Sequence, residues 1–189
     1  MKTLLIFAFS LCLSGLVSAQ QKTVTGIWQF HSINNVGLLE GQTGSAFQLQ
    51  SINGMQYRSW FAGIGLGLDF YRYRTIPLFI DFRKEFGGSI NKFFAYADGG
   101  INFCWLTDNE KTMYLPDDHF SAGFYTDLGL GYKIGLGRNN HLMLSIGYSL
   151  KKLKETYQSY YYNPPDVLQD KDKINSSLNR LTIKIGWEF

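Results

Sequence analysis

The chain has 189 residues, of which only 17% are charged while 16% are aromatic and 20 are glycine. Soluble domains carry about a quarter charged residues, so this composition is atypical of them. The 18 Lys and Arg exceed the 15 Asp and Glu by enough to give a formal net charge of +3. That charge is too small to predict nucleic-acid binding.

The first 19 residues have the features of a secretory signal peptide. Lys2 supplies a positive charge and residues 4–13 form an apolar core. Residues 17–19 are small, as expected just before a cleavage site. The apolar run is too short for a membrane-spanning helix. We therefore predict cleavage after Ala19 and export of residues 20–189 as a single domain.

Eight segments of the exported chain alternate between apolar residues and polar or small ones. They are predicted as β-strands at residues 27–38, 46–56, 60–71, 76–86, 92–106, 123–136, 141–151 and 179–189. The third is representative, because its even positions from Ala62 to Phe70 are apolar whereas its odd positions include three glycines and Asp69. Such alternation suits a strand with lipid on one side and a polar lumen on the other.

The connections between these segments alternate in length. Short ones lie at residues 54–59, 87–91 and 137–140, and two of the others, 107–122 and 152–178, are long. Short turns on one rim and long loops on the other are typical of outer-membrane barrels. We therefore assign the short turns to the periplasmic rim and the long loops to the outer rim.

Alternation alone leaves open which face points outward. A soluble periplasmic ligand-binding barrel would place the apolar face inside. An eight-stranded barrel has an interior just wide enough for its own side chains, and the apolar faces here carry too many large residues to fit there. The sequence therefore predicts an all-β, eight-stranded, antiparallel, up-and-down transmembrane β-barrel, with the soluble barrel as the alternative.

Three segments, residues 53–57, 63–69 and 76–81, resemble small outer-membrane β-barrel proteins of the OmpX and OmpA transmembrane-domain type. The chain ends on Trp187 and Phe189, and this ending resembles the signal by which bacterial outer-membrane barrels are recognised for insertion. The resemblance implies an outer-membrane location, contact with outer-membrane lipid and lipopolysaccharide, and assembly by the barrel-assembly machinery. It also implies a structural or surface-adhesion role.

Charged residues recur on the polar faces of the predicted strands, where they would point into the lumen. They are Asp69, Asp81, Arg83, Glu85, Asp98, Asp127, Lys133, Lys151, Arg180, Lys184 and Glu188. Acids and bases nearly balance, so we predict a network of ion pairs that plugs the lumen, because unpaired charges in a narrow interior would be costly. A path for protons or ions through the carboxylates is the alternative.

Nucleophilic hydrolysis needs a Ser, a His base and a carboxylate, so the three histidines are the candidate catalytic bases. His31 and the serine after it would lie on opposite faces of a strand, and His141 falls at a predicted periplasmic turn. His119 beside Asp117, Asp118 and Ser121 is the remaining candidate for catalysis, and its imidazole with the two carboxylates is a candidate site for a divalent cation. We predict no enzymatic activity, cofactor or metal, with a lipid A-modifying outer-membrane enzyme as the alternative.

Four tyrosines of the 152–178 connection are candidate contact residues: Tyr157, Tyr160, Tyr161 and Tyr162. Exposed tyrosines offer a large rigid contact area with a polar tip. They would bind a surface partner or glycan, or rest on lipopolysaccharide headgroups. The sequence identifies no particular ligand.

Overall fold

The computed structural model describes residues 28–41, 44–70, 74–87, 91–105, 119–137, 140–163 and 166–189. Side chains are described for these residues except 119–121 and 153–176. The predicted signal peptide, residues 1–19, lies outside the described residues. No helix in the described part of the chain is long and apolar enough to cross a membrane.

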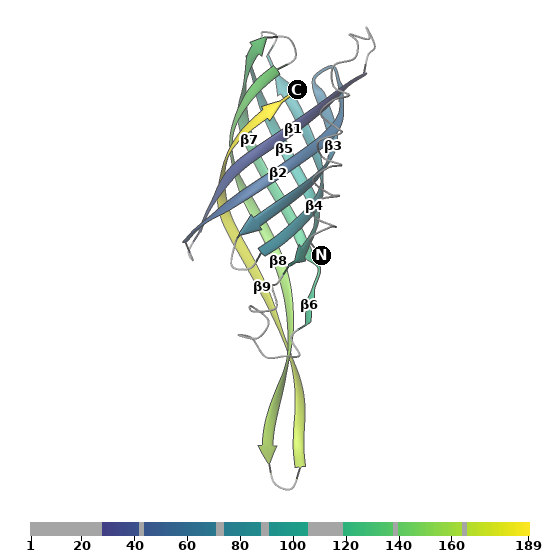
Figure 1. Cartoon of the computed structure of the whole chain (residues 1–189), viewed down its shortest axis with the longest axis vertical. Helices are drawn as coiled ribbons and strands as arrows, with labels where there is room; N and C mark the ends of the chain where they lie inside the picture. The colour runs from purple at the N-terminus through teal and green to yellow at the C-terminus, as the bar shows by residue number, and fades with distance from the viewer. Residues whose placement is uncertain are drawn as a thin grey trace, which may run out of the picture.

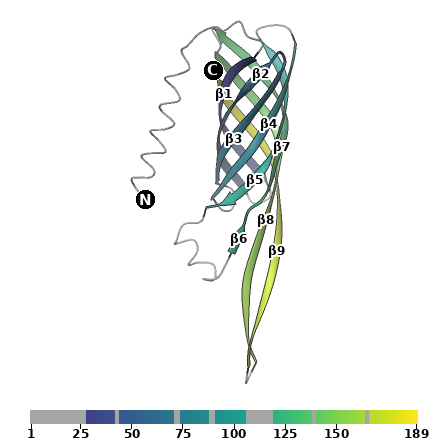
Figure 2. The same cartoon turned by 90° about the vertical axis from the view of Figure 1, so that its right-hand side faces the viewer.

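The described residues form nine β-strands, which follow one another along the chain. They are β1 (Trp28–Gly41), β2 (Gly44–Tyr57), β3 (Trp60–Phe70), β4 (Arg74–Phe86), β5 (Lys92–Cys104), β6 (His119–Ser121), β7 (Gly123–Gly137), β8 (Asn140–Asn163) and β9 (Asp166–Glu188). All pairings between them are antiparallel. The short β6 pairs only with β8, so eight strands form the barrel, as the sequence predicted (Figures 1 and 2).

The barrel closes where β1 pairs with β9, in a register that runs from Ile33 opposite Glu188 to Glu40 opposite Leu181. The last residue extends this seam, because the backbone N–H of Phe189 donates to the Ser32 carbonyl at 3.0 Å and the Ser32 N–H donates back at 2.8 Å. A closed barrel leaves no exposed strand edge within the bilayer. Phe189 therefore has a structural role in closure.

The two ends of the barrel differ strongly. At one end, which we call the terminal end, β1 begins and β9 finishes; at the other, β8 and β9 continue past their neighbours as a two-stranded ribbon (Figures 1 and 2). Their pairing is continuous from His141 opposite Glu188 to Asn163 opposite Asp166. The predicted strand ends at residues 151 and 179 were therefore wrong, and Lys152–Leu178 is mostly a β-ribbon rather than an irregular loop.

The sequence does not predict this ribbon because it lies beyond the part of the barrel where apolar side chains alternate with polar ones. Apolar alternation marks a strand only where one face is buried or lipid-facing, whereas backbone pairing can continue without it. The other long connection, predicted at 107–122, contains a short strand as well, since β6 pairs with β8 from His119 opposite Thr156 to Ser121 opposite Lys154.

The apolar face of the barrel strands points outward. In β3, Ile64 is 65% exposed and Leu66 55% exposed, while the alternate positions are buried. The same alternation runs through the strands on either side, so large exposed Leu, Ile and Phe side chains form a belt around the barrel. An apolar surface of this extent is incompatible with exposure to water. This arrangement excludes the soluble barrel, which would bury these side chains inside.

Aromatic side chains also point into the lumen, and glycines opposite them provide the space. A Cβ atom added at Gly65 would overlap the ring of Phe79, and one added at Gly131 would overlap the ring of Phe94. Both rings belong to the buried cluster inside the barrel. The glycines on the polar strand faces are thus part of the packing of the lumen.

Candidate functional site: the charged lumen

The polar faces of the barrel strands bring the predicted lumen charges together inside the barrel. All eleven charged residues predicted to face the lumen are buried, with no more than 8% of any of them exposed. Since charged side chains are almost never fully buried unless paired, their contacts decide what the lumen can do. The contacts fall into three layers from the terminal end to the ribbon end.

The layer nearest the terminal end is a chain of alternating charges. Lys133 Nζ lies 2.7 Å from Glu85 Oε1 and 2.5 Å from Glu188 Oε1, and Lys92 Nζ lies 2.7 Å from Glu85 Oε2. His31 Nδ1 lies 2.9 Å from Glu188 Oε1. Both carboxylates therefore have more than one partner, which is what a buried ion pair needs to offset its desolvation.

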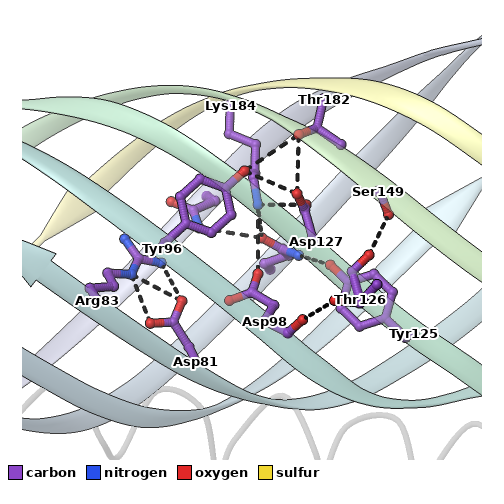
Figure 3. A network of polar contacts seen from close by, with 12 residues as sticks. Asp81, Arg83, Tyr96, Asp98, Tyr125, Thr126, Asp127, Ser149, Thr182 and Lys184 are labelled. Atoms are coloured by element: carbon purple, nitrogen blue, oxygen red, sulfur yellow. Dashed lines mark hydrogen bonds and ion pairs between the residues drawn. The ribbon is translucent and has the colours of Figure 1, made fainter.

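In the middle layer, Arg83 forms a bidentate pair with Asp81 (Figure 3). The Arg83 Nε donates to both Asp81 oxygens at 2.9 and 3.0 Å, and Nη2 donates to Oδ2 at 2.8 Å. The guanidinium is also close to the rings of Phe61, Phe94 and Tyr96, at 5.5 to 5.9 Å from their centroids. Arginine suits such a position because its planar fork matches a carboxylate and stacks on aromatic faces.

A second pair in the middle layer joins β7 to β9. Lys184 Nζ donates to Asp127 Oδ2 at 2.9 Å, and the Tyr96 hydroxyl donates to Asp127 Oδ1 at 3.0 Å (Figure 3). Asp98 lies between Asp81 and Asp127 in the strand register. Its closest cation, Lys184 Nζ, is 3.8 Å away, and neither Asp98 oxygen accepts a hydrogen bond from a described group. Asp98 is therefore the least compensated carboxylate of this layer.

The layer at the ribbon end ties β8 to β3 across the lumen, and β9 to its neighbour β1 and to the start of β2. Lys151 forms an ion pair with Asp69 across the lumen. The Arg180 Nη1 donates to the carbonyl oxygens of Leu39 and Gly44 at 3.3 and 2.8 Å. Lys151 thus pairs with a carboxylate, whereas Arg180 donates to main-chain carbonyl oxygens, so a balance of acidic and basic residues does not account for every contact in this layer.

Several lumen residues were not predicted from the sequence. Phe61, Phe79, Phe94, Tyr96 and Tyr125 are buried inside the barrel. A signal for them exists, because each occupies an inward position in a strand whose other inward residues are mostly polar or glycine. Large rings at such positions indicate a lumen filled by side chains.

The remaining predicted sites are distributed as follows. Trp187 is exposed on the outward face of β9. Tyr157, Tyr160, Tyr161 and Tyr162 lie in the ribbon part of β8, and their side chains are outside the described residues. His119 begins β6, while Asp117 and Asp118 lie outside the described residues. Among described residues, no group of three His, Cys, Asp or Glu side chains could hold a metal ion.

A closed eight-stranded barrel with an apolar outer belt and a charged interior defines the class of this protein, a membrane-spanning β-barrel. No protein-family model and no curated protein matches the chain. Solved structures do: the Neisserial surface protein A has a TM-score of 0.51 at 11% identity, covering 86% of this chain and 96% of that one.

Two further solved structures give the same picture. The outer membrane protein OprG from Pseudomonas aeruginosa has a TM-score of 0.51 at 14% identity, covering 84% of this chain and 94% of that one. The outer membrane protein AlkL has a TM-score of 0.51 at 11% identity, covering 89% of this chain and 93% of that one. These similarities establish the fold, a small barrel of the kind found in outer-membrane proteins.

Proposed function

We propose that this protein is a non-catalytic outer-membrane barrel that presents the β8–β9 ribbon at the cell surface for binding, while its lumen stays sealed. The observation that carries the proposal is the contrast between the two parts of β8 and β9. Inside the barrel their charges are paired with other strands. Beyond it, the same strands project together without a break in register (Figure 2).

The size of the barrel and its contents support a sealed lumen. An eight-stranded barrel has room for side chains and little else. Here that room holds three layers of ion pairs with aromatic rings between them. A continuous ion path would require these pairs to separate, which leaves buried charges without partners.

The ribbon supplies the reach that a surface-binding role needs. From Lys152 to Asn163 it extends over roughly 40 Å, at about 3.4 Å per residue. We assign the contact role to Tyr157, Tyr160, Tyr161 and Tyr162, with lipopolysaccharide or a surface ligand as the binding partner. Assembly by the barrel-assembly machinery, with Trp187 and Phe189 as its signal, is part of the same proposal.

A non-catalytic role is supported by the positions of the described histidines. His31 and His141 lie 2.9 and 3.9 Å from Glu188 Oε1, inside the terminal end of the lumen. A lipid-modifying hydrolase would need its base beside an outward-facing serine. These two imidazoles are instead part of the ion-pair layer that fills the lumen.

The binding role can be tested by removing the ribbon while keeping the barrel. Joining Leu153 to Ser176, which are register partners, through an Asn-Gly turn would close β8 and β9 as a tight hairpin. We expect this variant to show the same heat-dependent gel mobility as the wild type and to lose binding to cells or isolated surface glycans. Equal binding by both proteins would contradict the proposal.

A finer variant tests the tyrosines separately from the ribbon. Replacing Tyr160, Tyr161 and Tyr162 by serine should reduce binding without changing gel mobility. Replacing Tyr148, which is exposed on the apolar belt of β8, by phenylalanine is the matched control. If the triple variant fails to insert, those tyrosines belong to the membrane-contacting surface instead.

The sealed lumen can be tested by single-channel recording of the reconstituted protein in planar bilayers. We expect no steady conductance. Reproducible currents whose selectivity changes when Asp81 or Arg83 is neutralised would show that the lumen conducts ions.

A further inference from the structure

The apolar belt of the barrel is interrupted at one place, on the outward face of β1 and β2. Asn34, Ser51 and Asn53 are exposed there, and we call them the β1–β2 polar patch. Asn34 lies directly opposite Ser51 in the register, and Asn53 is the next outward position along β2. The three side chains are therefore contiguous on the surface that faces lipid.

The patch lies at the middle of the barrel wall rather than at a rim. Asn34 is midway between Trp28 and Glu40 on β1, and Ser51 is midway between Ser45 and Tyr57 on β2. The rings of Trp28 and Tyr57 stack with centroids 4.8 Å apart, at the level where interfacial aromatic residues are found. Lipid headgroups are consequently too distant to solvate the patch.

The polar groups of the patch also lack partners within the chain. None of the three side chains has a hydrogen bond to any other group in the part of the chain that the structure describes. Acyl chains offer neither donors nor acceptors, and polar groups without partners are costly in a bilayer. The contrast with Thr126 is informative, because its outward-side hydroxyl donates to the Asp98 carbonyl at 2.8 Å.

The other barrel strands carry no comparable interruption. Over the described central positions of β3, β4, β5, β7, β8 and β9, the outward residues are apolar, aromatic, alanine or glycine, apart from Thr126. The patch is framed by large exposed apolar side chains, among them Leu38, Leu49 and Ile64. Small and polar residues are also enriched where transmembrane helices pack together, because they allow close approach and hydrogen bonds in lipid; the same physical reasons apply to a barrel wall.

We propose that the β1–β2 polar patch is the interface through which two copies of this chain associate side by side in the membrane. An asparagine amide both donates and accepts hydrogen bonds, so the patch is chemically complementary to itself. A two-fold axis along the membrane normal brings the patch of one copy onto that of the other while both barrels keep the same orientation. Each copy then supplies the hydrogen-bond partners that its own chain and the lipid do not.

The first experiment measures association in lipid vesicles by energy transfer between labelled copies, over a range of protein-to-lipid ratios. We expect the wild type to associate, and Asn34→Leu/Asn53→Leu to weaken association at least tenfold. Thr126→Val, which removes the one internally bonded polar group of the belt, is the matched control and should associate like the wild type. Absence of association in the wild type, or equal association by the double variant, would overturn the proposal.

The second experiment does not depend on the leucine variants folding. Cysteine is introduced at Ser51 in a Cys104→Ser background, and native membranes are oxidised with copper phenanthroline. A disulfide requires Cα atoms within about 7 Å of each other, so we expect Ser51→Cys to give a product of twice the monomer mass. Leu128→Cys, on the belt at β7, should remain monomeric. Equal cross-linking at both positions, none at Ser51, or an adduct with a different protein would overturn the second-copy assignment.

Discussion

Replacing Arg83 by methionine should reveal whether the middle of the lumen is dry. The substitution keeps most of the volume and the contacts with the surrounding rings of Phe61 and Phe94, but leaves the fully buried Asp81 without its bidentate partner. At the 2.8 Å separation of this pair, the gross attraction is about 6 kcal/mol for an effective dielectric constant of about 20. In a water-filled lumen it would be about 1.5 kcal/mol.

The net cost expected for Arg83→Met in a dry lumen is about 3–5 kcal/mol, because removing one partner leaves an uncompensated buried charge. The double variant Asp81→Leu/Arg83→Met should recover most of this loss, since an apolar pair of similar volume replaces the whole ion pair. A hydrated, screened pair would instead cost about 1 kcal/mol or less when broken.

Equilibrium urea unfolding in phospholipid vesicles can measure these differences. Tryptophan fluorescence reports the transition, because Trp28, Trp60, Trp105 and Trp187 are all exposed on the outer surface and would leave the bilayer on unfolding. A loss below about 1 kcal/mol for Arg83→Met, with no recovery in the double variant, would refute the dry lumen. The same result would remove the main support for the sealed barrel.

Three further outcomes follow from the contacts of single residues. In the same urea titration, Asp98→Asn should lower the free energy of unfolding by about 1 kcal/mol or less, or should raise it, because Asp98 is poorly compensated. Asp127→Asn should lower it by about 3 kcal/mol, because Asp127 pairs with Lys184. Gly65→Ala should reduce the refolded fraction, seen as heat-dependent gel mobility, because its Cβ would overlap a lumen ring; Gly99→Ala, which has open space around it, should refold normally. Phe189→Ala should slow insertion in pulse-labelled cells, because it removes the aromatic ring of the proposed assembly signal. It keeps the two backbone hydrogen bonds of the seam, so the urea midpoint of the refolded protein should be nearly unchanged.

The barrel and its faces could be predicted from the sequence because the physical cause is local. In β3, each residue from Phe61 to Phe70 meets either lipid or lumen, so the alternation of the sequence is the alternation of the environment. The same parity predicts that Asp81 and Lys184 point inward, and both are buried in the lumen. It applies equally to Phe61 and Phe79, which are large rings on otherwise mostly polar strand faces.

The pairing of the charges could not be predicted, because it depends on the stagger between strands. Lys133 meets Glu85 and Glu188 only because β4 and β9 present these residues at the same height in the barrel. Stagger is a property of closure and not of any one segment. The ribbon was missed for a related reason, since backbone pairing between Lys152 and Leu178 leaves no apolar period in the sequence.

The lumen network and the ribbon are connected through the same two strands. Along β9, Arg180 bonds to main-chain carbonyls at the β1–β2 end, Lys184 pairs with Asp127, and Glu188 pairs with Lys133. Along β8, Lys151 pairs with β3 across the lumen at the level where the ribbon begins. A force applied to the ribbon by a bound partner would therefore be transmitted along continuous strands into a set of ion pairs spread over the whole height of the barrel.

An ion-pair network adds little to stability compared with an apolar core of equal volume, but it fixes the relative positions of strands from several sides. In the proposed surface-binding role, the network would thus anchor β8 and β9 where they continue past the other strands.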